Sequence, residues 1–469
     1  MSFAATDPCT ASLLYELPAH NETERECVIA RVHADQRRWC QCTIAERAPF
    51  VSALGEALRR HRESLALVLA VEMGKPLASG RAEVDKCAAL CLHAPVMAAQ
   101  ALATETLVDD VTCLVTLRYD ALGTVLAIMP WNFPYWQALR FAVPALLAGN
   151  GVLIKPATSV PGSATWLARC FDEARTESAS LGVPPAPCDV ALFEIDVLDQ
   201  VIADARIVGV TLTGSDRAGR HVAQVAGAHL KKVVLELGGS DPFLLLPDAD
   251  VERAAAVAVA ARTVNSGQSC IAAKRFIVCE QVYDEFVERL VLGMSALTMG
   301  DPRDERTQIG PIATASVRDE LARQVRASIT LGARPLVGGD NTDLPGFFYP
   351  PTVLVDIPAD APAAREELFG PVAAVFRVAN EAEAIRLANA SAFGLGASVW
   401  TSDAAVAERC IAQLDAGMVF VNDMVVSDLR YPFGGIKQSG MGRELGHVGF
   451  REFTNLKLAR ILHPPARLL

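Results

Sequence analysis

The chain has 469 residues, of which 51% are hydrophobic and 21% charged, and its formal net charge is −11 at pH 7. This length exceeds what one hydrophobic core usually supports, so two domains are expected. The acidic balance argues against a general nucleic-acid binder. The N-terminus lacks the pattern of a signal peptide, and the longest uncharged segment, between Asp120 and Arg140, is interrupted by Pro and Asn. We therefore expect a cytoplasmic protein without nucleic-acid or membrane partners.

The chain contains 12 cysteines. Without an export signal they are expected to be reduced thiols rather than a disulfide framework. Cys40 with Cys42 and Cys87 with Cys91 are the closest pairs, and neither has a further pair or a His at zinc-ligand spacing. The sequence therefore predicts no metal site.

Elements are predicted from the spacing of apolar residues. In the first half, helical spacing predicts helices over 45–73 and 82–99. Short uncharged apolar runs, each ending at turn or polar residues, predict strands buried on both faces at 124–129, 151–154, 207–212 and 233–235. Because helical segments separate these runs, the first half is expected to form an open parallel sheet of βαβ units.

The second half repeats this style. Helices are predicted over 250–264, with Asp250 or Asp248 near the N-cap, and over 283–294. Strands are predicted at 275–279, 347–355 and 372–378. The boundary between the halves is placed near Gly238 and Gly239, where two glycines let the backbone bend. The fold class is therefore α/β.

Two candidate reactive side chains flank this boundary. Cys270 follows Asn-Ser-Gly-Gln-Ser between a helix and a strand, where a turn can expose a thiol to a cleft; the alternative is simple packing. Glu236 ends an apolar strand, so burial would raise its pKa toward that of a general base. The alternative is an ion pair with Lys231 or Lys232.

Two turns that follow predicted strands could contact a ligand. Asn132 lies between Pro130 and Pro134, and its amide could donate to an oxyanion or merely bond its own turn. Residues 214–219 open a helix whose N-terminus is a potential anion site, although Gly and Ser there can also be simple caps.

Five motifs together resemble the aldehyde dehydrogenase superfamily, in its order and spacing: 130–134 (PWNFP), 236–239 (ELGG), 267–270 (GQSC), 367–371 (ELFGP) and 432–440 (PFGGIKQSG). The stretches 124–137, 235–243 and 299–304 are most similar to NAD(P)-accepting succinate-semialdehyde dehydrogenases. The resemblance implies the aldehyde dehydrogenase fold, with a Rossmann-like cofactor domain. It also implies oxidation of an aldehyde to its carboxylate, and the expected aldehyde is succinate semialdehyde.

The resemblance assigns catalytic roles without a metal. Cys270 is the nucleophile that forms a thiohemiacetal and then a thioester. The Asn132 amide and the Cys270 backbone N–H hold the oxyanion, and Glu236 activates water.

The cofactor implied is NAD or NADP. Residues matched to its binding are Trp131, Lys155, Gly214, Ser215, Leu237, Glu367 and Phe369. Thr158 stands where NAD-selective relatives carry a Glu; a hydroxyl there would not repel a 2′-phosphate, so dual use of NAD and NADP is expected.

Arg140 and Ser427 match positions that bind the substrate carboxylate. The alternative for Arg140 is a structural ion pair on a helix. Val264 replaces a second arginine found in some relatives, which should loosen selectivity.

The resemblance also implies a domain division and a homodimer or homotetramer. Residues 1–113 and 126–238 would form the cofactor-binding domain and 239–430 the catalytic domain, with 431–449 returning to the cofactor side. Residues 114–125 and 450–469 would form oligomerisation segments, with a hairpin pairing 114–118 with 119–124 and a strand at 453–462.

Three alternatives remain open from the sequence. The substrate could be another aldehyde, such as glutarate semialdehyde or a medium aliphatic one. Coenzyme A rather than water could resolve the thioester, although Glu236 argues against this. The protein could also keep the fold without catalysis.

Overall fold

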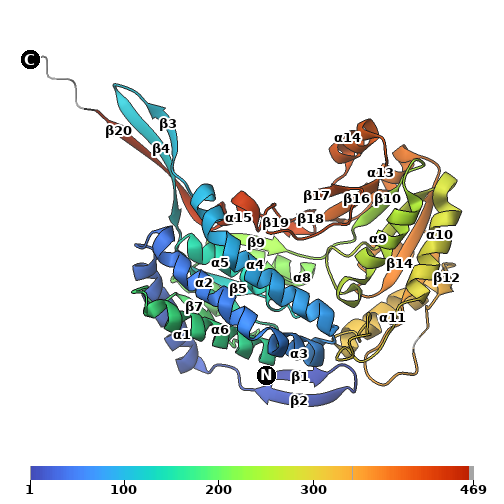
Figure 1. Cartoon of the computed structure of the whole chain (residues 1–469), viewed down its shortest axis with the longest axis horizontal. Coiled ribbons are helices and arrows are strands. Elements are labelled where there is room, and N and C mark those ends of the chain that lie inside the picture. The colour runs from blue at the N-terminus through green and yellow to red at the C-terminus, as the bar shows by residue number, and fades with distance from the viewer. Residues whose placement is uncertain (1, 341, 464–469) are drawn as a thin grey trace, which may run out of the picture.

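The computed structural model describes residues 2–340 and 342–463. Two large sheets lie side by side, each covered by helices, and a small three-stranded sheet projects from the first half (Figure 1). The chain passes from the first large sheet to the second between β9 (Lys232–Glu236) and β10 (Pro242–Leu245). Gly238 and Gly239, where the boundary was predicted, lie in this connection.

The first large sheet has six strands in the order β19-β9-β8-β5-β6-β7. Its parallel strands, besides β9, are β5 (Thr124–Ile128), β6 (Gly151–Lys155), β7 (Cys188–Val190) and β8 (Ile207–Thr213). The predicted parallel sheet is therefore confirmed. The two-residue strand β19 (Gly440–Met441) pairs antiparallel with β9, which brings a segment from near the C-terminus beside Glu236.

Helices cover this sheet. They are α1 (Glu22–Trp39), α2 (Ile44–Arg60), α3 (Arg62–Met73), α4 (Leu77–Ala101), α5 (Trp136–Leu147), α6 (Pro161–Ala179), α7 (Leu198–Ala203), α8 (Asp216–Ala228) and α15 (Gly446–Glu452). The single helix predicted over 45–73 is wrong, because the structure breaks it at His61. The His61 ring contacts Glu173 of α6 at 2.8 Å, a tertiary contact that apolar periodicity cannot reveal.

The second large sheet has seven strands in the order β12-β13-β14-β11-β10-β16-β17, and only the β12–β13 pair is antiparallel. Besides β10, the strands are β11 (Arg275–Cys279), β12 (Arg334–Val337), β13 (Thr352–Val355), β14 (Val372–Val378), β16 (Gly396–Trp400) and β17 (Met418–Val421). The strand predicted at 347–355 begins only at Thr352, since Pro350 and Pro351 have no N–H to donate to a neighbouring strand.

The helices and short elements of this half are α9 (Val251–Thr263), the 3-10 helix η1 (Val264–Gly267), α10 (Glu280–Ser295), α11 (Ala315–Thr330), α12 (Pro362–Arg365), α13 (Glu381–Asn389), α14 (Ala404–Gln413) and the strand pair β15 (Phe393–Gly394) and β18 (Ile436–Lys437). Asp250 caps α9 by accepting from the Arg253 N–H at 3.0 Å, as predicted.

The predicted hairpin within 114–124 is wrong. Residues Cys113–Ala121 form one continuous strand, β4, which pairs with β3 (Glu105–Asp109) and with β20 (Thr454–Leu462). The turn lies at Asp110, whose carboxylate accepts the N–H groups of Thr112 and Cys113. Residues 464–469 of the predicted C-terminal segment lie outside the described residues.

A separate antiparallel pair, β1 (Phe3–Asp7) and β2 (Ser12–Leu17), lies at the N-terminus. Within residues 2–340 and 342–463, no helix has both the length and the apolar character needed to cross a membrane.

Candidate active site

A cleft of about 520 Å³ lies where the two large sheets meet. It is lined by residues from both halves of the chain, including eight of the predicted site residues: Trp131, Asn132, Gly214, Ser215, Leu237, Cys270, Glu367 and Phe369. Five of these follow the carboxyl ends of β5, β8 and β9, the edge at which open α/β sheets bind ligands.

The loop that carries Cys270 has an unusual backbone. Asn265, Ser266 and Gly267 all have positive φ, of 53°, 56° and 79°. A Cβ on Gly267 would lie 2.3 Å from the carbonyl carbon of Gly370, so only glycine fits there. This chain reversal returns the backbone toward the cleft, where the partly buried Cys270 thiol lies.

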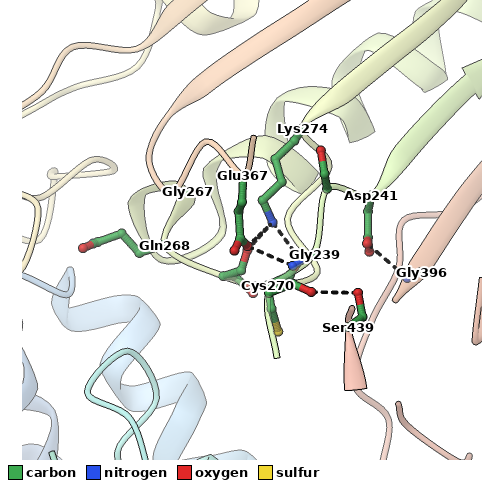
Figure 2. Close-up of polar contacts among 12 residues, drawn as sticks. Gly239, Asp241, Gly267, Gln268, Cys270, Lys274, Glu367, Gly396 and Ser439 are labelled. Carbon is green, nitrogen blue, oxygen red and sulfur yellow. Dashed lines mark hydrogen bonds and ion pairs between the residues drawn. The ribbon is translucent and has the colours of Figure 1, made fainter. Parts of the chain in front are cut away.

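Side chains from outside the loop fix it by donating to its carbonyl groups. Arg262 donates to the Gly267 oxygen at 2.7 Å, and the Asn132 amide donates to the Gln268 oxygen at 3.0 Å. Lys274 Nζ donates to the Ser269 and Cys270 oxygens at 2.8 and 2.7 Å (Figure 2). Residues 265–270, which carry the expected nucleophile Cys270, are called the nucleophile loop below. Asn132 lies beside this loop, and its second amide N–H is available to a ligand.

Burial raises the pKa of the Cys270 thiol to about 12, while the positive charges of Lys274 and Arg140 act in the opposite direction. The negative charges of Glu367 and Glu236 raise it further. Formation of the reactive thiolate consequently needs a nearby proton acceptor or an additional positive charge.

Glu236 is such an acceptor by position. It ends β9 and is 1% exposed, and both carboxylate oxygens lack a hydrogen-bond partner among the described residues. Burial raises its pKa well above the usual range. The alternative of an ion pair with a neighbouring lysine is excluded, because Lys231 donates to the Asp204 carbonyl and Lys232 lies 3.6 Å from Glu452.

Glu367, Trp131 and Phe369 place polar and aromatic groups side by side in the lining of the cleft. Glu367 accepts from the Gly239 N–H at 3.1 Å, and Lys274 lies 3.2 Å from the same carboxylate oxygen (Figure 2). The Trp131 and Phe369 rings meet edge to face, 5.8 Å between centroids. A pair of oriented polar groups beside two aromatic rings suits a flat heterocycle attached to a sugar.

The turn before α8 forms another part of the cleft. Gly214 and Ser215 line the cleft there, and the Ser215 hydroxyl caps α8 by accepting from the Ala218 N–H at 3.3 Å. A helix N-terminus that opens onto a cleft is a potential anion site. Lys155, at the end of β6, is 4% exposed and has no hydrogen-bond or ionic partner among the described residues. Its ammonium is therefore free to donate a hydrogen bond to a ligand hydroxyl. Thr158 follows in the next turn, outside the residues that line the cleft.

Comparison with known proteins matches residues 1–459 to the model of the aldehyde dehydrogenase family. The chain belongs to this family. It is 44% identical to succinate-semialdehyde dehydrogenase [NADP(+)] 1 of Mycobacterium ulcerans, over 97% of this chain and 99% of that protein. Among solved structures, Gox0499, studied for cofactor and substrate selection, has a TM-score of 0.94 at 39% identity, covering 98% of this chain and all of that one. Succinic semialdehyde dehydrogenase from Streptococcus pyogenes, in complex with NADP+, has a TM-score of 0.93 at 34% identity, with the same coverage.

In this aldehyde dehydrogenase the predicted carboxylate-binding residues lie outside the cleft lining. Arg140 on α5 is 2% exposed, forms an ion pair with Glu444, and lies over the Phe433 ring at 4.4 Å. The alternative of a structural ion pair therefore describes Arg140 in this structure, although its Nη2 is buried without a hydrogen-bond partner among the described residues. Ser427 is also buried and accepts from the Trp136 indole N–H at 3.2 Å.

Sequence reasoning missed three cations near the site. Lys274 contacts the nucleophile loop, Arg217 lines the cleft at the start of α8, and Lys86 on α4 lines a neighbouring cavity. Lys274 could have been found, because a lysine between Ala-Ala and an apolar strand is costly to bury without a purpose. No cluster of three metal-ligating side chains occurs in the described part of this family member.

Proposed function

We propose that this protein oxidises succinate semialdehyde to succinate with NADP+ or NAD+, through a thioester on Cys270. The observation that carries the proposal is the convergence of Cys270, Asn132 and Glu367 on one cleft, with Glu236 buried close enough for its charge to affect the thiol. The similar proteins of Mycobacterium ulcerans and Streptococcus pyogenes are succinate-semialdehyde dehydrogenases, which agrees with it.

The first step needs a thiolate. We propose Glu236 as the acceptor of the Cys270 proton, directly or through water, because its side chain is buried and its charge acts on the thiol. The thiolate sulfur then bonds to the aldehyde carbon, and the carbonyl π electrons move to oxygen. The Asn132 amide stabilises this oxyanion, and one such donor is typically worth about 3–4 kcal/mol in the transition state.

When bound, the nicotinamide supplies the hydride acceptor. Loss of hydride from the thiohemiacetal carbon leaves an acyl group on the Cys270 sulfur. Glu236 then accepts a proton from water as the water oxygen bonds to the acyl carbon, and the C–S bond breaks. The balance is one aldehyde, one oxidised cofactor and one water giving one carboxylate, one reduced cofactor and two protons.

NADP is the expected preference, since Thr158 carries no charge that would repel a 2′-phosphate and the similar succinate-semialdehyde dehydrogenases are named for, or solved with, NADP+. NAD use is also expected, because nothing at Thr158 excludes a free ribose hydroxyl.

The test is turnover by purified protein, followed as reduced-cofactor absorbance with succinate semialdehyde, glutarate semialdehyde and butanal and with each cofactor. Succinate semialdehyde should have the highest kcat/KM, without added coenzyme A. Cys270→Ser should abolish the signal, and mass spectrometry should find an acyl adduct only on the unmodified Cys270 peptide. Turnover by Cys270→Ser at the normal rate would refute the scheme.

We further propose a cytoplasmic homodimer or homotetramer that pairs through the projecting sheet β20-β4-β3. Its strands expose apolar side chains at Leu107, Val108, Leu456, Leu458 and Ile461, which suits burial against a second copy. Size-exclusion chromatography with light scattering tests it, and Leu458→Lys should shift the mass toward that of the monomer.

A further inference from the structure

A second cavity, of about 500 Å³, lies beside the nucleophile loop and apart from the cofactor cleft. Phe133 and Asn265 line it, whereas Asn132 and Cys270 line the cofactor cleft, so the 132–133 turn and the nucleophile loop separate the two spaces. A dinucleotide in the cofactor cleft would obstruct an aldehyde arriving from that side. The second cavity therefore lies on the other side of the 132–133 turn and the Cys270 loop from the cofactor cleft.

Lys86 is the cation in this cavity without an anionic partner. It projects from α4, and its Nζ lies 4.1 Å from the centroid of the Trp136 ring. No hydrogen bond or ion pair involves its ammonium among residues 2–340 and 342–463. The other charged side chains around the cavity are satisfied, since Glu83 pairs with Lys75 and Glu305 with Arg81.

The surroundings of Lys86 combine low polarity with further donors. Trp136, Phe133 and Val264 supply apolar walls. The Trp136 indole N–H donates to Ser427 at 3.2 Å, which leaves the Ser427 hydroxyl hydrogen free for another acceptor. Arg140 is close enough for its charge to lower the pKa of Lys86. Lys86 is therefore a cation without an ionic partner among the described residues, beside an aromatic ring at the wall of the cavity, a setting that an anion would stabilise.

We propose that Lys86 binds the carboxylate of the aldehyde substrate in this cavity. The inference rests on the proposed function and deepens it, because it assigns substrate selection to a residue on α4. Val264 lines the same cavity without a charge, and Lys86 is the one lysine or arginine among the described residues that line it.

The experiment compares KM for succinate semialdehyde and for butanal, which has the same carbon number and no charge. Lys86→Met should raise KM for succinate semialdehyde about 10- to 100-fold, as expected for loss of one charge-assisted contact, while KM for butanal stays within about twofold. Lys86→Arg should retain most of the discrimination. Inhibition by succinate against butanal should weaken in Lys86→Met by a similar factor.

Arg59→Met is the matched control, since it removes an exposed cation from the neighbouring helix α2 and should change neither KM. Thermal melting of each variant checks the fold. Equal effects of Lys86→Met on both aldehydes, or none on succinate semialdehyde, would overturn the proposal while the wild-type activity upheld the proposed function. Absence of wild-type turnover with every aldehyde would instead refute the proposed function.

Discussion

Lys274 forms an ion pair with Glu367, with 3.2 Å between Nζ and Oε1, and the same ammonium donates to the Cys270 carbonyl at 2.7 Å. One buried charge therefore connects the nucleophile loop to the carboxylate expected to hold the nicotinamide ribose. Both Lys274 and the loop belong to the segment between α9 and β11, whereas Glu367 precedes β14. If Glu367 holds the cofactor as proposed, this contact would set the distance between the cofactor and the sulfur.

We predict that Lys274→Met lowers kcat about tenfold and raises KM for the cofactor, because it releases Glu367 and removes a positive charge that lowers the Cys270 pKa. The pH profile of kcat should move toward higher pH. Lys232→Met, at a partly exposed lysine at the start of β9 and outside the cleft lining, is the control for a Lys-to-Met change. A Lys274→Met enzyme with lower kcat but an unmoved pH profile and cofactor KM would show that the lysine only supports the fold.

A second prediction concerns the thiol. Because burial raises the pKa of Cys270 to about 12, its thiolate fraction should increase with pH throughout the range 6–9. Iodoacetamide alkylation of the Cys270 peptide, followed by mass spectrometry in the protein without cofactor, should therefore accelerate over that whole range. A rate that is already constant above pH 7 would contradict this.

Glu236→Gln should slow the reaction while leaving the protein at least as stable as the wild type. Without the base, deacylation should slow by about 10²–10⁴-fold, so the acyl adduct accumulates. A first burst of reduced cofactor should remain but form more slowly, because Cys270 also loses its proposed proton acceptor. Complete loss of the burst would instead assign Glu236 mainly to deprotonation of Cys270.

The same variant should be the more stable protein at high pH. The pKa of Glu236 is raised in the folded state, so the stability associated with its protonated form is lost as pH rises through that folded-state pKa. Glutamine stays neutral, and the melting temperature of Glu236→Gln should exceed that of the wild type by an amount that grows between pH 6 and 9. A difference independent of pH would argue against a raised pKa.

Cofactor choice should respond to charge at Thr158. Thr158→Glu should lower the NADP/NAD ratio of kcat/KM by about tenfold or more, because a carboxylate there would repel the 2′-phosphate. In the Thr158→Gln variant the glutamine side chain has nearly the same size as glutamate but no charge, so the ratio should stay within about twofold of the wild-type value. Equal ratios for the two variants would remove Thr158 from cofactor selection.

The sequence predicted those features that depend on local pattern. Uncharged apolar runs identified the parallel strands, and motifs identified Cys270, Asn132 and the cleft residues before the structure placed them together. Features that depend on contacts between distant parts of the chain could not be predicted from the sequence. Arg140 pairs with Glu444 from near the other end of the chain, and β19 has only two residues, too few for any periodicity. Lys86 resembles an ordinary surface lysine in a helical pattern until the fold places it over Trp136.

The last prediction follows from the position of Lys86. Burial, and then the charge of Arg140 on α5, lower the pKa of Lys86 to about 8, whereas Cys87 and Glu83 on its own helix and Asp428 after β17 act to raise it. The ammonium is lost as pH rises through this value. The ratio of KM for succinate semialdehyde to KM for butanal should therefore increase between pH 7 and 9, although a bound carboxylate would shift the midpoint upward.

Using this ratio removes effects common to both aldehydes, such as titration of Cys270 and Glu236. Lys86→Arg supplies the decisive comparison, because a guanidinium stays protonated throughout this range and its KM ratio should remain flat. A ratio that rises equally in wild type and Lys86→Arg would trace the pH dependence to a group other than Lys86.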